Sequence, residues 1–180
     1  MSLLSPGPYH ILSYGTLLGT TFFHTFINGI LAFRVLPRPQ FATLMSHIFP
    51  VYFSLQTALP ALLVLTYPGS RNPFGSASGV AGVFFDRDNR WTVLVPLAGA
   101  FLSSAVNLGV VGPATTGVME ERRVQEKKDG KKSYDAPPHS QEMTELNKRF
   151  GMLHGVSSLL NLGSFISTVA YGFTLASRLA

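Results

Sequence analysis

Apolar residues fill four long stretches of the chain, and the charged residues lie between these stretches or beyond them. The first stretch, from His10 to Phe33, contains no Lys, Arg, Asp or Glu, and Arg34 and Arg38 follow it around a Leu-Pro pair. A hydrocarbon core about 30 Å thick needs roughly 20 helical residues to cross it, because each residue advances about 1.5 Å. The pattern therefore predicts a membrane-spanning helix over residues 10–33.

The second stretch follows a polar turn at residues 36–40 and stays uncharged to Tyr67. It predicts a span over residues 43–67. Pro50 and Pro60 interrupt it, and a proline inside a helix removes one backbone hydrogen bond. We expect the two prolines either to kink this helix or to divide it into an interfacial piece, residues 41–49, and a crossing piece.

The remaining stretches predict a third span over residues 91–112 and a fourth over residues 150–175. Residues 68–90 are rich in Gly, Ser, Asn and Pro and predict a loop outside the lipid, with Phe74 and residues 80–85 resting on the membrane surface. Trp91 is expected at the water boundary. Between the last two spans, residues 115–128 carry opposite charges at helical spacing and predict an ion-paired helical extension. Residues 129–141 are expected to be flexible, and helix resumes at Glu142.

These elements predict an all-α, polytopic membrane protein, with residues 1–180 forming one four-helix bundle and residues 115–149 a helical region outside the membrane. Composition agrees, because 46% of residues are hydrophobic and only 13% are charged, against about 25% charged in soluble domains. The chain has no cysteine, which excludes disulfides and thiolate metal sites. Its net charge of +5 resides in separate loops, so we expect no nucleic-acid partner.

The Lys and Arg residues are concentrated in the first and third loops. Cytosolic loops carry an excess of these residues, so both termini are predicted to lie on the non-cytosolic side. The amino terminus has neither a basic start nor an Arg-rich pattern, so a cleaved presequence is not expected. An endomembrane or the plasma membrane is the favoured location, and a mitochondrial membrane is left open.

Polar residues inside the spans need partners, because hydrocarbon offers none. We expect five such residues to line the bundle: Asn28, Asn107, His154, Ser157 and Asn161. One interpretation is that they bond across helices and fix the packing, at about 0.6 kcal/mol each. The alternative is a haem or copper site formed by His154 with His24 or His47. No spacing in the sequence specifies a metal, so the favoured prediction has no cofactor.

Two further features concern the helix surfaces. Gly15 with Gly19, and Gly151 with Gly155, each place two small residues on one face, and we favour packing within the chain over dimerisation.

Arg34 and Arg38 are expected either to reach lipid phosphates or to pair with Glu120 or Glu121. Motifs of conventional soluble active sites, such as a nucleophile elbow or a phosphate-binding loop, are missing from the sequence.

Several motifs resemble those of the transmembrane protein 205 family, and together they reach all four predicted spans. They are Gly29 before Phe33-Arg34-Val35-Leu36-Pro37-Arg38, then Phe49-Pro50-Val51-Tyr52-Phe53, then Asn107 with Pro113, Thr115-Thr116 and Met119, and finally His154-Gly155-Val156-Ser157-Ser158 with Asn161-Leu162. His24 and Ala114 depart from the family pattern. The resemblance implies a small four-span protein whose biochemical activity is not established, the animal member being associated with resistance to platinum drugs. It favours His154, Asn161, Asn107 and Arg38 for a shared role.

Three hypotheses on function follow. The first is a non-enzymatic scaffold or accessory subunit of a membrane assembly, whose partners are lipids, other membrane proteins or a second copy of the chain. The second is a haem- or copper-binding redox or transport protein that uses the intramembrane histidines. The third is solute transport, which would require oligomerisation because four helices seldom enclose a pore.

Overall fold

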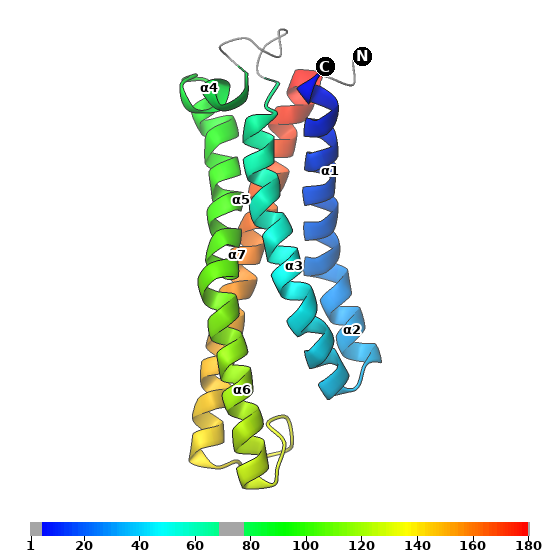
Figure 1. Ribbon diagram of the computed structural model, residues 1–180, viewed down its shortest axis with the longest axis vertical. Helices are drawn as coiled ribbons and strands as arrows, with labels where there is room; N and C mark the ends of the chain where they lie inside the picture. Colours follow the sequence, from blue (N-terminus) through cyan, green and yellow to red (C-terminus); the bar gives the residue numbers. More distant parts are fainter. Residues whose placement is uncertain (1–4, 69–77, 180) are drawn as a thin grey trace.

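The computed structural model describes residues 5–68 and 78–179, and Figure 1 shows the bundle that they form. Four helices are long and apolar enough to cross a membrane: Pro6–Val35, Arg38–Leu65, Arg90–Asp129 and Gln141–Arg178. The predicted class, an all-α protein with four candidate spans, is confirmed. The first helix extends beyond its predicted span at both ends, the second begins earlier and ends at Leu65 rather than Tyr67, and the third and fourth continue through the helical region predicted outside the membrane.

The first long helix comprises α1 (Pro6–Phe23), a π-helical segment η1 (His24–Asn28) and α2 (Gly29–Val35). Pro8 lies within the first turn, where its missing N–H has no intrahelical role. The helix ends at Leu36, which is extended, and Pro37 follows. The predicted turn after the first span is therefore present.

The second long helix, α3 (Arg38–Leu65), runs unbroken through Pro50 and Pro60. The expected division into an interfacial and a crossing piece is therefore wrong. Pro60 has no N–H for the carbonyl of Gln56, and the hydroxyl of Ser104 on a neighbouring helix lies 3.0 Å from that carbonyl oxygen. The same hydroxyl lies 2.8 Å from the Ala100 carbonyl of its own helix, so its proton is shared and replaces the backbone bond that the proline removes only in part.

The third long helix follows a short helix, α4 (Gly79–Phe84), while the predicted surface residue Phe74 lies outside the described residues. The long helix comprises η2 (Arg90–Leu94), α5 (Val95–Val106), η3 (Asn107–Val111) and α6 (Gly112–Asp129). Here Pro96 leaves the carbonyl of Thr92 without a donor, and Thr174 Oγ1 donates to it at 2.9 Å. A hydroxyl from another helix therefore lies against the carbonyl freed by a proline at two places, Pro60 and Pro96.

The fourth long helix, α7 (Gln141–Leu179), begins after Ser140, whose side-chain oxygen accepts the backbone N–H of Met143 at 3.1 Å. This is a conventional N-cap. The preceding loop, predicted to be flexible, is held by side chains, because Lys131 Nζ donates to the Pro138 carbonyl at 2.7 Å. Helix α6 ends at Gly130, which adopts the left-handed conformation that glycine tolerates best.

Helix α7 lies at the centre of the packing and contacts α1, α5 and α6, while α3 contacts α1 and α5. Helices α5 and α7 approach closely at Gly99, where an added Cβ would lie 2.7 Å from Ser167 Oγ. We call the end of the bundle where α1 begins and α7 ends the terminal end, and the opposite end the hairpin end (Figure 1).

The two ends are packed differently. The main apolar core lies toward the terminal end and consists of Leu17, Leu63, Tyr67, Val83, Val93, Leu97, Tyr171 and Leu175. At the hairpin end, α2 has no buried residue and α6 has only Val118. Figure 1 shows the α2–α3 turn set apart from the tip of the α6–α7 hairpin.

Candidate functional site

Hydrophilic side chains from three helices meet in the middle of the bundle, and we call this group the mid-bundle polar layer. Its members are Thr21, Thr25, Tyr52, Gln56, Asn161 and Ser164. Four of the six are buried, and Thr25 and Asn161 are half-buried. The layer joins the first, second and fourth long helices.

Gln56 is the central residue of this layer. Its side chain is fully buried, and its Nε2 lies 3.2 Å from Thr21 Oγ1, 3.0 Å from Asn161 Oδ1 and 3.5 Å from Ser164 Oγ. A glutamine is long enough to reach both neighbouring helices, and its amide donates two protons. Gln56 therefore ties α3 to α1 and α7 at one level.

Asn161 completes the connection from the fourth long helix. Its Oδ1 accepts the hydroxyl of Tyr52 at 2.6 Å, and its Nδ2 donates to Thr25 Oγ1 at 2.6 Å. Thr25 belongs to η1, and π-helical turns occur frequently at functional sites. The sequence predicted Asn161 as an interior residue, and it lies in the polar layer.

Asn107 forms a second contact between helices at the start of η3. It is fully buried, and its Nδ2 donates to the carbonyl of Ser157 at 3.1 Å. The N–H of Gly112 closes the π turn by bonding to Asn107 O, and an added Cβ at Gly112 would lie 2.7 Å from that oxygen. Asn107 and Ser157 were both predicted to belong to the interior, and the structure brings them together.

His24 and Asn28 interact with each other along their own helix. Asn28 Nδ2 lies 3.0 Å from His24 Nδ1, and the His24 ring packs 4.1 Å from Tyr52 and 5.1 Å from Phe49, measured between centroids. The described contacts do not link Asn28 to Asn107 or Asn161. His24, in contrast, borders the polar layer through Tyr52.

The other two histidines lie on the surface. His47 is exposed and its Nδ1 lies 2.9 Å from the carbonyl of Thr43 in the same helix. His154 is also exposed and stacks on Phe150 at 6.0 Å, so its predicted place in the inner lining is wrong. Helical phase is not the reason, because His154 lies seven residues before Asn161 and so shares nearly the same face of α7; that face is half-buried at Asn161 and exposed at His154.

Within the described residues, no three His, Asp or Glu side chains gather as a metal-binding group would, and the contacts of His24, His47 and His154 do not join these histidines to one another. Haem or copper ligation by these histidines stays a prediction. An absorbance spectrum and metal analysis of protein from its native source test it.

A second polar cluster, at the terminal end, was not predicted. His10 is fully buried, with its Nδ1 3.0 Å from Thr66 Oγ1 and its Nε2 2.6 Å from Tyr171 Oη. Thr66 donates its own proton to the carbonyl of Leu62, so His10 Nδ1–H donates to Thr66 and Nε2 accepts from Tyr171. This chain of bonds joins the start of α1 to the ends of α3 and α7.

Asn89 extends this cluster to the loop before η2. It is buried, its Oδ1 accepts from Tyr67 at 3.1 Å and from Arg178, and its Nδ2 donates to the Gly82 carbonyl at 2.9 Å. These residues were hard to identify from the sequence, because they lie at the ends of predicted spans and far apart along the chain.

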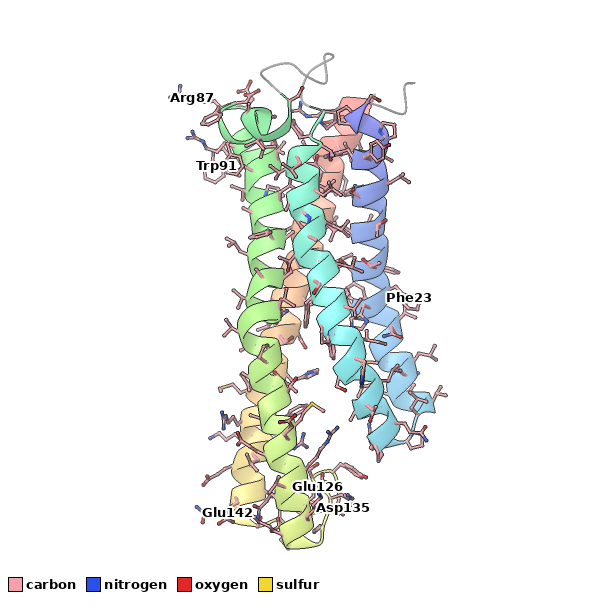
Figure 2. All side chains as sticks on the ribbon, viewed as in Figure 1. Phe23, Arg87, Trp91, Glu126, Asp135 and Glu142 are labelled. Carbon is pink, nitrogen blue, oxygen red and sulfur yellow. The ribbon has the colours of Figure 1, made fainter. Side chains whose placement is uncertain are left out.

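The predicted interfacial residues occupy the rims of the bundle. Trp91 is 75% exposed, and Figure 2 shows it on the outer side of the bundle just below α4, with Arg87 above it beside α4. The guanidinium of Arg38 lies 3.5 Å from the centroid of the Phe33 ring. The suggested partner Glu121 pairs instead with Arg149, at 3.3 Å.

The tip of the α6–α7 hairpin is organised by Glu126, labelled in Figure 2. Its carboxylate accepts the backbone N–H and the hydroxyl of Ser133 at 3.0 and 2.6 Å, and Lys132 Nζ at 3.2 Å. Burial alone would raise the pKa of Glu126, but the hydrogen bonds from Ser133 and Lys132 outweigh it and hold the pKa below its usual value. The predicted ion pairing is thus made to the loop and to α7 rather than along α6.

The glycine strips face away from the bundle. Gly15, Gly19, Gly151 and Gly155 are exposed, and a Cβ built on any of them would meet nothing within 4 Å. The expectation that these strips pack within the chain is therefore wrong. The close approaches use other glycines, notably Gly99 against Ser167 and Gly172 against Tyr14.

Fold and polar contacts together define a small multi-pass helical membrane protein, whose interior is held by hydroxyl and amide groups. The family described as a domain of unknown function (DUF4149) matches residues 12–124, and the chain belongs to this family. The chain is also similar to the Xanthocillin biosynthesis cluster protein D of Aspergillus fumigatus, with 30% identity over 172 residues that cover 96% of this chain and 90% of that protein. No solved structure matches.

Proposed function

We propose that this protein is a non-enzymatic accessory subunit of a membrane assembly, and that it binds a partner membrane protein through the outer face of α1. The observation that carries the proposal is the strip formed by Gly15 and Gly19, which is exposed and where an added Cβ would meet no atom of the described residues within 4 Å. Two small residues four positions apart let another helix approach closely in lipid. Leu12 and Phe23 flank the strip and are exposed as well.

The interior supports the same role. Its buried polar groups are mostly hydroxyls and amides that bond to one another, an arrangement that fixes helix packing. The Aspergillus relative is named as a protein of a xanthocillin biosynthesis cluster, and an accessory subunit of a biosynthetic membrane assembly agrees with that name. The resemblance to the transmembrane protein 205 family stays a separate prediction, and it implies a four-span protein without an established activity.

Affinity purification in mild detergent tests the proposal. Tagged wild-type protein is compared with a Gly15→Leu/Gly19→Leu variant and with Gly109→Leu, a matched control at another exposed glycine with nothing within 4 Å. We expect a stoichiometric membrane protein that copurifies with the wild type and the control and is lost with the double variant. Recovery of the chain alone, or only with a second copy of itself, contradicts the accessory role.

A further inference from the structure

Two oxygen atoms near the middle of the bundle are buried and have no hydrogen-bond partner in the part of the chain that the structure describes. They are Gln56 Oε1 and Asn107 Oδ1, and both residues are fully buried. Ser104, whose hydroxyl lies 3.0 Å from Gln56 O, precedes Asn107 by one helical turn, so the two amides lie at neighbouring levels of the bundle. Buried amide oxygens are nearly always hydrogen-bonded, because losing water without a replacement is costly.

Turning either amide over does not remove the problem. The Asn107 Nδ2 donates to the Ser157 carbonyl at 3.1 Å, so the reversed amide would place two oxygens opposite each other. Reversing Gln56 would place its oxygen against Asn161 Oδ1, which accepts the Tyr52 hydroxyl, and would leave the Gln56 NH₂ without a partner instead. In either orientation of the Gln56 amide, one of its two ends therefore lacks a hydrogen-bond partner among the described residues.

The residues around these oxygens limit which molecule or ion could bond to them. The four apolar stretches contain no acidic side chain, so a cation at this level would lack a counter-charge and would be expensive to bury. The molecule that bonds to Gln56 Oε1 and Asn107 Oδ1 must therefore be neutral, small and able to donate two hydrogen bonds. We propose that an ordered water links Gln56 Oε1 to Asn107 Oδ1, which makes the middle of this membrane bundle a hydrated site.

The proposed water lies inside the bundle and the glycine strip lies on its outer face, so the water site does not depend on the proposed accessory role. Buried waters usually make about three hydrogen bonds and form part of the fold. The water would therefore join the second and third long helices at the level where η3 begins. It would act in addition to the contact between the Ser104 hydroxyl and the Gln56 carbonyl. The first and fourth helices are joined to Gln56 directly.

Water-edited solid-state NMR of the full chain in lipid bilayers tests the proposal. Magnetisation from water protons is passed to the side-chain amides, and the backbone N–H of Leu17, a fully buried residue of the apolar core, serves as the dry reference. We expect the Gln56 and Asn107 side-chain amides to retain signal at short transfer times at which Leu17 has none. Amide signals as weak as that of Leu17 would overturn the proposal.

A variant tests whether one water connects the two residues. Gln56→Met keeps the length of the side chain and removes the amide, so the water loses one partner and the Asn107 signal should fall toward the Leu17 level. Asn28→Leu is the matched control, because Asn28 bonds within its own helix, and it should leave Asn107 unchanged. An Asn107 signal that is unaffected by Gln56→Met overturns the link, and the wild-type spectrum remains decisive should this variant fail to fold.

Discussion

The terminal end and the hairpin end of the bundle use different contacts. At the terminal end, His10, Tyr171 and Asn89 are buried and join α1, α3, α7 and the loop before η2. At the hairpin end, the ring and ion contacts lie within pairs of consecutive helices, such as Phe33 with Phe41 and Arg149 with Glu121. The chain is therefore one bundle at its terminal end and middle, and beyond the polar layer its two helix pairs diverge, with a small contact kept between α3 and α6.

We expect the largest loss of stability from a substitution in the buried cluster at the terminal end. Tyr171→Ala removes a buried ring and the hydroxyl that lies 2.6 Å from His10 Nε2, and we expect a loss of about 3 to 5 kcal/mol in the free energy of unfolding. Phe33→Ala, at an exposed ring of the hairpin end, should cost less than about 1 kcal/mol. Unfolding in mixed detergent micelles measures both, and equal losses would contradict the comparison.

An intermediate effect is expected where a proline frees a carbonyl. Ser104→Ala removes the hydroxyl 3.0 Å from Gln56 O, and we expect a loss of about 0.6 to 1.7 kcal/mol, the range for hydrogen bonds between helices in membranes. Ser54→Ala is the control, because Ser54 is exposed and donates to the Pro50 carbonyl in its own helix. The same unfolding assay decides, and a control as destabilised as Ser104→Ala would show that the contact between helices adds nothing.

The tip of the α6–α7 hairpin should respond to pH. The pKa of Glu126 is held below its usual value in the folded loop, so its stabilising effect is present above the usual carboxyl pKa and is lost as the pH falls through the folded pKa. Hydrogen exchange at the Ser133 amide, which donates to Glu126, reports this after correction for intrinsic rates. We expect protection to fall on acidification in the wild type, and a pH-independent protection factor would contradict the assignment.

The smallest effect is expected at the exposed ion pair of the same hairpin. Arg149 and Glu121 are 55% and 51% exposed, so water and salt screen their attraction. Arg149→Gln should therefore change the free energy of unfolding by less than about 0.5 kcal/mol. A loss above 1 kcal/mol in the detergent assay would show that this pair, and not only Glu126, holds the hairpin.

Much of this architecture was predictable from the sequence, because hydrocarbon imposes a simple rule on it. Uncharged runs such as residues 10–33 must be helical and long enough to cross, so the four spans and the turn at Pro37 followed from length and charge alone. Asn107 and Asn161 were identified for a related reason, since amides in a span need partners.

The partners themselves could not be read from the sequence, because they depend on how each helix is rotated in the bundle. Gln56, the single amide in the second stretch, was missed although it is the centre of the polar layer. His154 was placed inside and is exposed although it shares a helix face with Asn161, so the level along the bundle matters as well as the rotation of the helix. The prolines misled for the same reason, since the Ser104 and Thr174 hydroxyls that compensate for Pro60 and Pro96 come from other helices.

Distance measurement between pairs of spin labels tests the comparison of the two ends most directly, and the absence of native cysteine makes the labelling specific. One pair joins Gln40 on α3 to Val124 on α6 at the hairpin end, and the other joins Tyr9 on α1 to Val95 on α5 at the terminal end, all at exposed positions. We predict a broad distance distribution for the first pair and a narrow one for the second, in protein reconstituted in lipid. A hairpin-end distribution as narrow as that of the terminal end would contradict the account.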